Sequence, residues 1–200
     1  NSLIPKRRRK RQDWTTNPCG EIILRPRGFC NLTEVVIRAE DTLETLMEKI
    51  KVATMIGTIQ STLTNFTLLD DLHDDWKKNA EEERLLGVSM TGQMDNPDIL
   101  TQNNLQSLRD YSVGVNVETA ERLKINRSAA ITTTKPSGTV STLVNSASGF
   151  HPRFADYYIR RVRISATDPL YRMMKDQGVK FHPEVGQPVE TAQTWVVEFP

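Results

Sequence analysis

The chain of 200 residues contains only two cysteines, Cys19 and Cys30. A small secreted domain held together by disulfides would carry cysteines at a much higher density. The two cysteines lie eleven positions apart, whereas a zinc site usually starts from a Cys-x-x-Cys pair. In a reducing compartment such thiols are either inert parts of a core or chemically employed, and composition alone favours the inert alternative.

Long apolar runs are also missing from the chain. No stretch approaches the roughly 20 apolar residues that are needed to span a bilayer. The basic run at positions 6–11 is not followed by the apolar core of a signal peptide. A net charge of +1 says almost nothing about partners, and a hydrophobic content of 38% is enough for a real core. We therefore expect a cytoplasmic enzyme or binding protein that has neither a membrane nor a nucleic-acid partner.

The two ends of the sequence suggest a fragment. The chain begins with Asn1 instead of Met, and it stops inside an apolar, β-prone run at 194–199. A natural terminus is seldom a strand that has just begun, because the edge of that strand would be left unpaired. The first residues, 1–16, are expected to form a basic exposed arm or loop.

Hydrophobic periodicity predicts alternating strands and helices. A strand is expected at 31–37, followed by a helix that Asp41 and Thr42 cap and that runs to about Leu63. Apolar residues of this helix recur at spacings of three and four and predict one buried face: Leu43, Leu46, Met47, Ile50, Ile56, Ile59 and Leu63.

The rest of the chain repeats this rhythm. Further strands are expected at 85–90, 129–134, 157–164 and 194–199. Helical patterns run through Leu105, Leu108, Val115 and Leu123 and over 169–177. Such alternation predicts an α/β fold with a largely parallel sheet, in which ligands gather at the carboxyl ends of the strands.

The segment Asn17-Pro18-Cys19-Gly20-Glu21 places a cysteine on a constrained loop among polar groups. Pro18 stiffens the backbone before the sulfur, and Gly20 allows another molecule to come close. Glu21 supplies a carboxylate that can move protons, and the Asn17 amide is suited to fixing hydroxyl groups. These neighbours make Cys19 a candidate for chemistry. The alternative is a turn whose cysteine is merely buried.

A second candidate site follows the β-prone run at 129–134. The stretch Pro136-Ser137-Gly138-Thr139-Val140-Ser141 is a glycine- and hydroxyl-rich turn ahead of a possible helix. Backbone N–H groups and a helix N-terminus converge in such a turn and attract anions. The Walker pattern is absent, because its Gly-Lys-Ser/Thr ending is missing. A turn with a simple hydroxyl cap remains the alternative.

These motifs and their order closely resemble those of the ribonucleotide reductases. The resemblance rests on Asn17-Pro18-Cys19-Gly20-Glu21-Ile22 and, eleven residues after Cys19, on Phe29-Cys30-Asn31-Leu32. It extends through 85–88, 134–141 and 149–153 and so covers most of the chain. The short spacing between the cysteines is like that of the adenosylcobalamin-dependent class, because the iron-dependent relatives generally space theirs more widely. The resemblance overturns the expectation that the cysteines are inert.

This resemblance implies a role for each residue of the first motif. Cys19 would become a thiyl radical at the tip of a loop and take the hydrogen from the 3′ carbon of the ribose. Glu21 would accept the proton of the 3′-hydroxyl, and Asn17 would hold the ribose hydroxyls. Cys30 would be one of two thiols that reduce the 2′ position, its partner being absent here. Both cysteines are therefore expected to be free.

The resemblance also implies a fold, a cofactor and partners. Residues 17–200 would form the second half of a ten-stranded α/β barrel, incomplete at both ends, with an inward catalytic finger loop. The cofactor would be adenosylcobalamin, the substrate a ribonucleotide, more in the manner of the triphosphate enzymes, and the reductant thioredoxin-like. Substrate phosphates would be bound by four residues of the second motif: Ser137, Gly138, Thr139 and Ser141. The fragment alone should be inactive.

Two rival functions are also compatible with the sequence. One is the large subunit of an iron-dependent reductase, which is fed by a separate radical subunit. The other is a nucleotide-binding module without catalysis, which the missing partner cysteine would permit.

Other polar features have simpler explanations. The run 70–75 could be imagined as a metal cluster but reads as a charged turn, so no metal site is predicted. The basic run 6–11 resembles a nucleic-acid patch, although a solvated arm fits it better. His151 either ties a turn or lines a site. Tyr157, Tyr158, Arg160, Arg161 and Arg163 alternate as a strand would, and one face of them could meet an anion.

Overall fold

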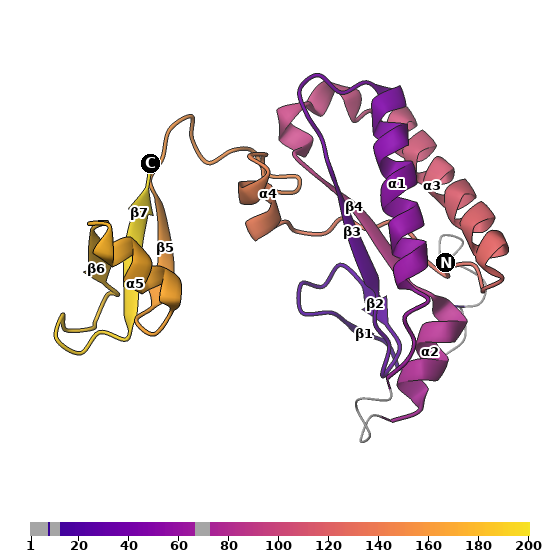
Figure 1. The fold of residues 1–200 in the computed structure, drawn as a ribbon. Coiled ribbons are helices and arrows are strands. Elements are labelled where there is room, and N and C mark those ends of the chain that lie inside the picture. The colour runs from indigo at the N-terminus through magenta and orange to yellow at the C-terminus, as the bar shows by residue number, and fades with distance from the viewer. Residues whose placement is uncertain (1–7, 9–12, 67–72) are drawn as a thin grey trace. The chain divides into compact units, whose positions relative to one another are not determined.

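The computed structural model describes residue 8, residues 13–66 and residues 73–200. The chain divides into two compact units, residues 1–153 and residues 154–200, which are described separately below (Figure 1). The boundary between the units, at Arg153 and Phe154, falls inside the range 17–200 that the resemblance assigns to half of a barrel.

The first unit is built on parallel pairing of β3 (Asn31–Val36) with β4 (Leu86–Thr91), in a register that sets Asn31 against Leu86. The helix α1 (Leu43–Gln60) forms the crossover between the two strands. The expected strand at 129–134 lies beside β4 as an isolated parallel bridge between Val88 and Thr132. The predicted parallel α/β arrangement is therefore confirmed in this unit.

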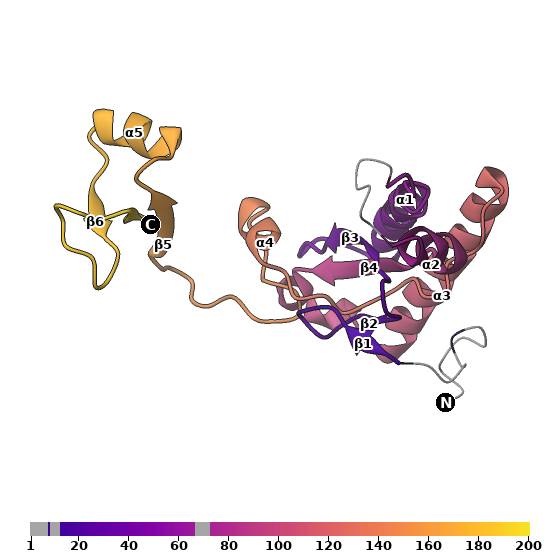
Figure 2. The ribbon, with the colours of Figure 1, turned by 90° about the horizontal axis from the view of Figure 1, so that it is seen from below.

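The remaining elements of the first unit are short strands and helices around this pair. A hairpin of β1 (Thr15–Thr16) and β2 (Ile23–Leu24) is antiparallel. The helix α1 covers one face of the β3–β4 pair, with α3 (Gln102–Leu123) packed beside it, and the hairpin lies over the other face (Figure 2). The other helices are α2 (Asp75–Glu83), the 3₁₀ turns η2 (Gln93–Asp95) and η3 (Pro97–Ile99), and α4 (Thr139–Leu143).

The beginning of α1 agrees with the sequence, because Thr42 is its N-cap and forms a capping box with Thr45. Its buried face differs from the prediction. Ile56, Ile59 and Leu63 are 47%, 52% and 73% exposed. Leu46 and Ile50 are buried as predicted, and the buried stripe continues through Ala53, Thr54, Gly57 and Thr58.

This difference arises because α1 meets α3 through polar side chains. Thr54 Oγ1 lies 2.8 Å from Ser112 Oγ, and Asn116 Nδ2 donates to Thr58 Oγ1 at 3.0 Å and to Ser128 Oγ at 2.9 Å. Since buried polar groups are tolerated when they are hydrogen-bonded, threonines occupy positions that a hydrophobic pattern assigns to apolar residues.

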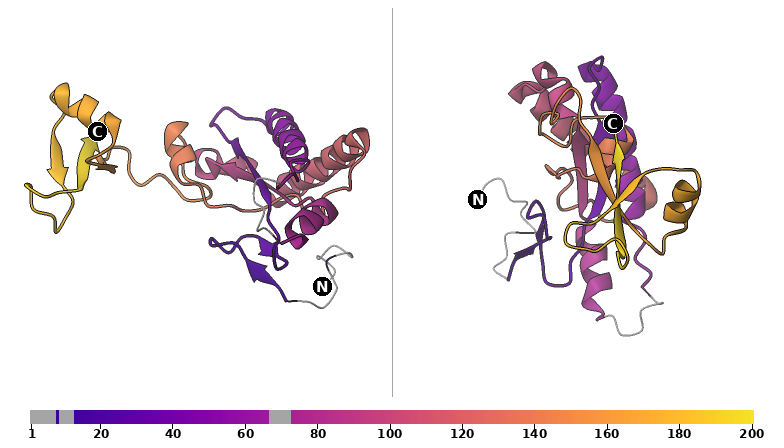
Figure 3. Two further views of the ribbon diagram at one scale, coloured as in Figure 1. Left: turned by 60° about the horizontal axis from the view of Figure 1, so that its bottom comes forward. Right: turned by 90° about the vertical axis from the view of Figure 1, so that its left-hand side faces the viewer.

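The second unit is a three-stranded antiparallel sheet with one helix (Figure 3). Its strand order is β5-β7-β6, formed by β5 (Arg160–Ser165), β6 (Phe181–Pro183) and β7 (Thr194–Phe199), with α5 (Pro169–Asp176) between β5 and β6. Tyr171 of α5 is buried against Phe181 and Trp195, at ring-centroid distances of 4.9 and 5.6 Å.

The prediction of a largely parallel sheet is wrong for this unit. Because β5 and β6 both run antiparallel to β7, they are parallel to each other with α5 as their crossover, and β7 is inserted between them. Hydrophobic periodicity cannot reveal such an insertion. The described residues combine helices with parallel and antiparallel strands, which confirms the α/β class. No described helix is long and apolar enough to cross a membrane.

Candidate active site

The loop at 17–22, between β1 and β2, is closed by hydrogen bonds of its own. Asn17 Oδ1 accepts from the backbone N–H of Ile22 at 2.9 Å, and the backbone N–H of Asn17 donates to the Ile22 carbonyl at 3.2 Å. The N–H of Gly20 donates to the Asn17 carbonyl at 2.9 Å, and Gly20 has a φ of +80°, a conformation that favours glycine. The Asn17 amide oxygen, which was predicted to fix substrate hydroxyls, is thus engaged in shaping the loop.

Cys19 lies at the tip of this loop and is exposed. Beside it, a Cβ added to Gly20 would meet no atom within 4 Å. The sulfur is therefore approachable from outside the chain, as a reactive cysteine must be.

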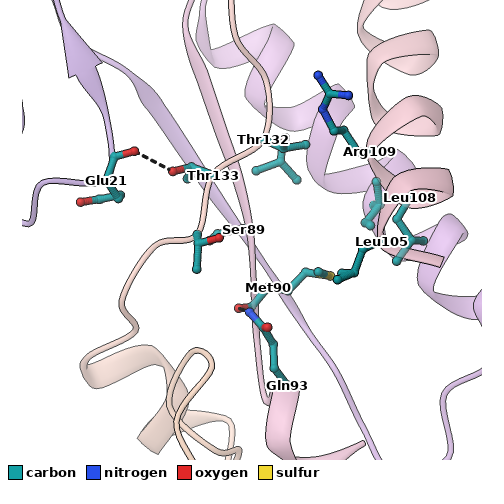
Figure 4. A pocket seen from close by; sticks show the side chains of 12 residues that line it. Glu21, Ser89, Met90, Gln93, Leu105, Leu108, Arg109, Thr132 and Thr133 are labelled. Atoms are coloured by element: carbon teal, nitrogen blue, oxygen red, sulfur yellow. Dashed lines mark hydrogen bonds between the residues drawn. The ribbon is translucent and has the colours of Figure 1, made fainter. Parts of the chain in front are cut away.

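Glu21 lines a cavity of about 700 Å³. Figure 4 shows Glu21 at one end of the lining and Arg109 of α3 at the other, with Thr132 and Thr133 between them. The Thr133 hydroxyl donates to the backbone carbonyl of Glu21 at 3.1 Å. The cavity also reaches the carboxyl end of β4, where the sequence predicted that ligands gather, at Ser89 and Met90.

The carboxylate of Glu21 is the unusual group of this cavity. Both of its oxygens are buried, and neither has a hydrogen-bond partner among the described residues. A buried polar atom without a partner is costly, and such exceptions mark sites that a ligand or a water completes. Glu21 can therefore accept a hydrogen bond or a proton from a ligand in the cavity.

Cys30 precedes β3 directly and is half-buried. Burial raises the pKa of its thiol to about 12, while the Arg8 guanidinium lowers this pKa and the Glu21 carboxylate raises it further. The Cys30 thiol is therefore protonated at neutral pH and lies within electrostatic range of Glu21. Cys19 and Cys30 are both free, as predicted.

A glycine in β4 positions the loop that carries Cys19. Ile22 is only 8% exposed and lies over Gly87. A Cβ added to Gly87 would stand 3.2 Å from Ile22 Cδ1 and 2.5 Å from Leu32 Cδ2. Gly87 thus leaves the space that Ile22 occupies. The sequence drew attention to the motif at 85–88 only as a resemblance and missed this role.

The second predicted site surrounds the start of α4. Ser137 Oγ is buried without a hydrogen-bond partner among the described residues, and the space around Gly138 is open. Thr139 is exposed. The hydroxyl of Ser141 is buried and donates to the Gly138 carbonyl at 2.8 Å, so it shapes the turn. The cavity lining extends to Thr134, three residues before Ser137.

The basic run 6–11 was predicted to be a solvated arm, and Arg8 is its one described residue. Arg8 is 9% exposed and pairs with Glu83 at 2.8 Å, so it is not solvated. The Arg8 charge has a carboxylate partner, which explains its burial.

The remaining candidates have partners inside the protein. The His151 ring packs on Phe150 at 4.4 Å between centroids. Arg161 and Arg163 pair with Glu198 and Glu184 across the sheet of the second unit. The predicted charged turn at 70–75 lies partly outside the described residues, and the described residues contain no cluster of three or more His, Cys, Asp or Glu suited to a metal ion.

Comparison with known proteins points in one direction. No family model matches the chain. The chain is 30% identical to the adenosylcobalamin-dependent ribonucleoside-triphosphate reductase of Lactobacillus acidophilus, over 92% of this chain and 28% of that protein. The corresponding enzyme of Levilactobacillus brevis is also 30% identical, over 92% and 27%. A probable enzyme of the same name from Dictyostelium discoideum is 29% identical, over 92% and 24%.

A solved structure shares the fold. It is a B12-dependent, class II ribonucleotide reductase that superposes with a TM-score of 0.66 at 24% identity, over 92% of this chain and 29% of that one. The curated relatives confirm the resemblance inferred from the motifs, and this structure shares the fold. The chain spans only about 28% of the length of the first of these curated relatives.

Proposed function

We propose that this chain is the segment of an adenosylcobalamin-dependent ribonucleotide reductase that carries the radical cysteine and its proton acceptor. The observation that carries the proposal is the Glu21 carboxylate, which is buried in a cavity with both oxygens unpartnered. This carboxylate lies two residues from an exposed cysteine and within electrostatic range of a second one. The names of the relatives supply the reaction class.

The residues of the loop then have distinct tasks. Cys19, as a thiyl radical, takes the hydrogen atom from the 3′ carbon of the ribose, and Glu21 accepts the proton of the 3′-hydroxyl; both are returned to the ribose once the 2′ position has been reduced. A protonated Cys30 supplies hydrogen to the 2′ position together with a second thiol, while the 2′-hydroxyl leaves as water and the two thiols become a disulfide. Asn17 holds the loop through Ile22 and presents its amide N–H groups to the ribose hydroxyls.

Generating a thiyl radical is beyond protein side chains alone. Adenosylcobalamin, when bound, supplies this step through homolysis of its cobalt–carbon bond. The exposed tip formed by Cys19 and Gly20, with open space around the glycine, fits the approach of a large cofactor. We assign no further contact with the cofactor to the described residues.

The turn before α4 is the proposed site of the substrate phosphates. Ser137 offers a buried hydroxyl without a partner, and Gly138 and Thr139 offer backbone N–H groups in open surroundings. Ser141 contributes by holding the Gly138 carbonyl. The relatives named as triphosphate reductases favour a ribonucleoside triphosphate.

The wider setting follows from the same proposal. The first unit would belong to the second half of a ten-stranded α/β barrel with the 17–22 loop directed inward, which the likeness to the class II structure supports. A thioredoxin-like dithiol would reduce the disulfide. Two free cysteines fit the reducing cytoplasm, and neither a membrane nor a nucleic acid is a proposed partner.

The test is turnover of a ribonucleoside triphosphate by the complete protein that carries this chain, with adenosylcobalamin, a dithiol reductant and no second subunit. We expect Glu21→Gln to lower kcat by about 10²–10⁴-fold, because the amide cannot accept the proton. Glu118→Gln, at an exposed position of α3, is the matched control and should leave kcat unchanged. An unaltered kcat in Glu21→Gln would refute the assigned role.

The two rival functions give different results in the same assay. An iron-dependent reductase would need its radical subunit and would ignore the cobalamin. A nucleotide-binding module would bind the triphosphate without forming any deoxyribonucleotide.

A further inference from the structure

Glu83, the last residue of α2, lies between two arginines from the basic N-terminal region and the hairpin. Arg8 Nε is 2.8 Å from Glu83 Oε1, and Arg25 Nε is 3.2 Å from Glu83 Oε2. The side chains of Glu83 and Arg8 are 8% and 9% exposed, and that of Arg25 is 18% exposed. One buried carboxylate thus holds two guanidinium groups, an arrangement much less screened by solvent than a surface pair.

Both arginines are attached to the base of the β1–β2 hairpin. Arg8 donates to the backbone carbonyl of Ile23 in β2, and its guanidinium lies 4.7 Å from the ring centroid of Trp14, just before β1. Arg25 follows β2 directly. The contacts of Glu83 therefore reach both strands of the hairpin. Arg8 connects Glu83 to Trp14 before β1 and to Ile23 in β2, and Arg25 connects it to the end of β2.

Such an anchor at the base of the hairpin adds to the two contacts nearer the loop, the seat of Ile22 over Gly87 and the hydrogen bond from Thr133 to the Glu21 carbonyl. The strands of the hairpin contribute only two residue pairs, Thr15 with Leu24 and Thr16 with Ile23, and a two-stranded ribbon is marginal by itself in water. The hydrogen bonds between Asn17, Gly20 and Ile22 lie within the loop, so they fix its shape without fixing its orientation.

The anchor also bears on the second thiol. Arg8 acts electrostatically on Cys30, in the direction opposite to burial. The carboxylate of Glu83 therefore fixes the position of the Arg8 guanidinium, whose charge acts on Cys30 and which contacts the hairpin.

We infer that Glu83 is a positioning residue, which clamps Arg8 and Arg25 at the base of the hairpin and so sets where Cys19 and Glu21 lie. The inference rests on the proposed function for its catalytic consequence, but the clamp itself can be tested without turnover. Glu82 provides a matched control, because it is adjacent, has the same chemistry and contacts Arg25 at 2.9 Å, yet its side chain is 48% exposed.

The first test measures the position of the loop in the chain itself. One spin label is placed on Cys19 and another on Lys51→Cys, an exposed site of α1, with Cys30 replaced by Ser. Electron–electron distance measurements should give one narrow distribution in the parent and in Glu82→Gln. Glu83→Gln should broaden or shift it, and Glu83→Asp, which keeps the charge, should restore part of the narrow population.

A second variant guards against a Glu83→Gln protein that does not fold. Arg8→Lys keeps the positive charge beside Glu83, but a single ammonium lacks the planar fork that serves Glu83 and the Ile23 carbonyl together. It should fold and broaden the distribution. If Glu83→Gln folded and gave the parent distance distribution, the clamp would be refuted. If Glu83→Gln did not fold, the parent distribution in Arg8→Lys would refute it.

The second test measures turnover in the complete protein. A displacement of about 1 Å in a reacting group can cost on the order of 10²-fold in rate, so Glu83→Gln should lower kcat by about that factor. The KM for the ribonucleotide should change little, because the proposed phosphate turn makes no contact with Glu83 among the hydrogen bonds described. A rise in KM of about the same factor, with kcat unchanged, would contradict the role of Glu83 in positioning the reacting groups.

The two tests separate the two proposals. If the distance distribution responds to Glu83 but the parent protein forms no deoxyribonucleotide, the clamp stands and the proposed function fails. If the parent is active and Glu83→Gln leaves both the distribution and kcat unchanged, the function stands and the clamp fails.

Discussion

Replacing Gly87 by Ala tests whether the hairpin loop depends on an empty position in β4. The new Cβ would stand 2.5 Å from Leu32 Cδ2 and 3.2 Å from both Ile22 Cδ1 and Thr133 Cγ2. Leu32 can swing away, since it is 38% exposed, whereas Ile22 is 8% exposed and is enclosed. The substitution should therefore displace Ile22, and with it the neighbouring Glu21.

The size of the effect follows from two opposing contributions. An alanine in the interior of a strand gains about 0.5–1 kcal/mol over glycine through its lower backbone entropy in the unfolded chain. Forcing an extra carbon into a packed site costs about 1–3 kcal/mol. Because the closest contact is well inside van der Waals distance, we expect the second contribution to dominate. The net loss of unfolding free energy should be about 1–2 kcal/mol.

The assay is urea unfolding of the 200-residue chain, followed by far-UV circular dichroism, in which the long helices α1 and α3 contribute most of the signal. Gly114→Ala is the control, because Gly114 lies in α3 and a Cβ there would meet no atom within 4 Å. This control should gain up to about 1 kcal/mol from helix propensity. A Gly87→Ala chain as stable as the parent would refute the close-packing explanation.

Two further results are expected from buried groups. Asn116→Leu should destabilise the chain by about 2–3 kcal/mol in the same unfolding assay, because it removes the acceptor of the buried Ser128 N–H and the donor to the Thr58 and Ser128 hydroxyls; an unchanged midpoint would show that the hydrogen bonds of Asn116 contribute nothing to stability. Iodoacetamide should modify the exposed Cys19 well before Cys30 at pH 8, as followed by mass spectrometry. Burial raises the pKa of the Cys30 thiol from its ordinary value of 9.0 to about 12, so this thiol stays protonated at pH 8 and becomes reactive only as the pH approaches about 12. Equal rates of modification of the two cysteines at pH 8 would contradict this burial.

Much of the secondary structure can be read from the sequence where local signals decide the outcome. The capping residue Thr42 and the terminal strand at 194–199 both lie where the sequence places them. The buried face of α1 cannot be read in this way. Thr54 is buried because Ser112, 58 positions away, offers a hydroxyl partner, and no hydrophobic pattern contains that information.

The candidate site shows the same division. The residues around Cys19 identify the loop, because their chemistry is local. The backbone of Glu21 is held by Thr133, which is 112 positions away, and the position of Ile22 depends on the glycine at position 87. The ion pair that buries Arg8 likewise requires Glu83, so the sequence assigned this arginine to a solvated arm.

The proposed role of Cys19 is tested most directly by deoxyribonucleotide formation in a Cys19→Ser variant of the complete protein, compared with the parent in the presence of adenosylcobalamin and a dithiol. Serine keeps the size and polarity of the side chain at this exposed loop tip but cannot carry the thiyl radical. We expect turnover in the parent and none in the variant, with binding of the ribonucleoside triphosphate retained. Turnover at the parental rate in Cys19→Ser would contradict this role.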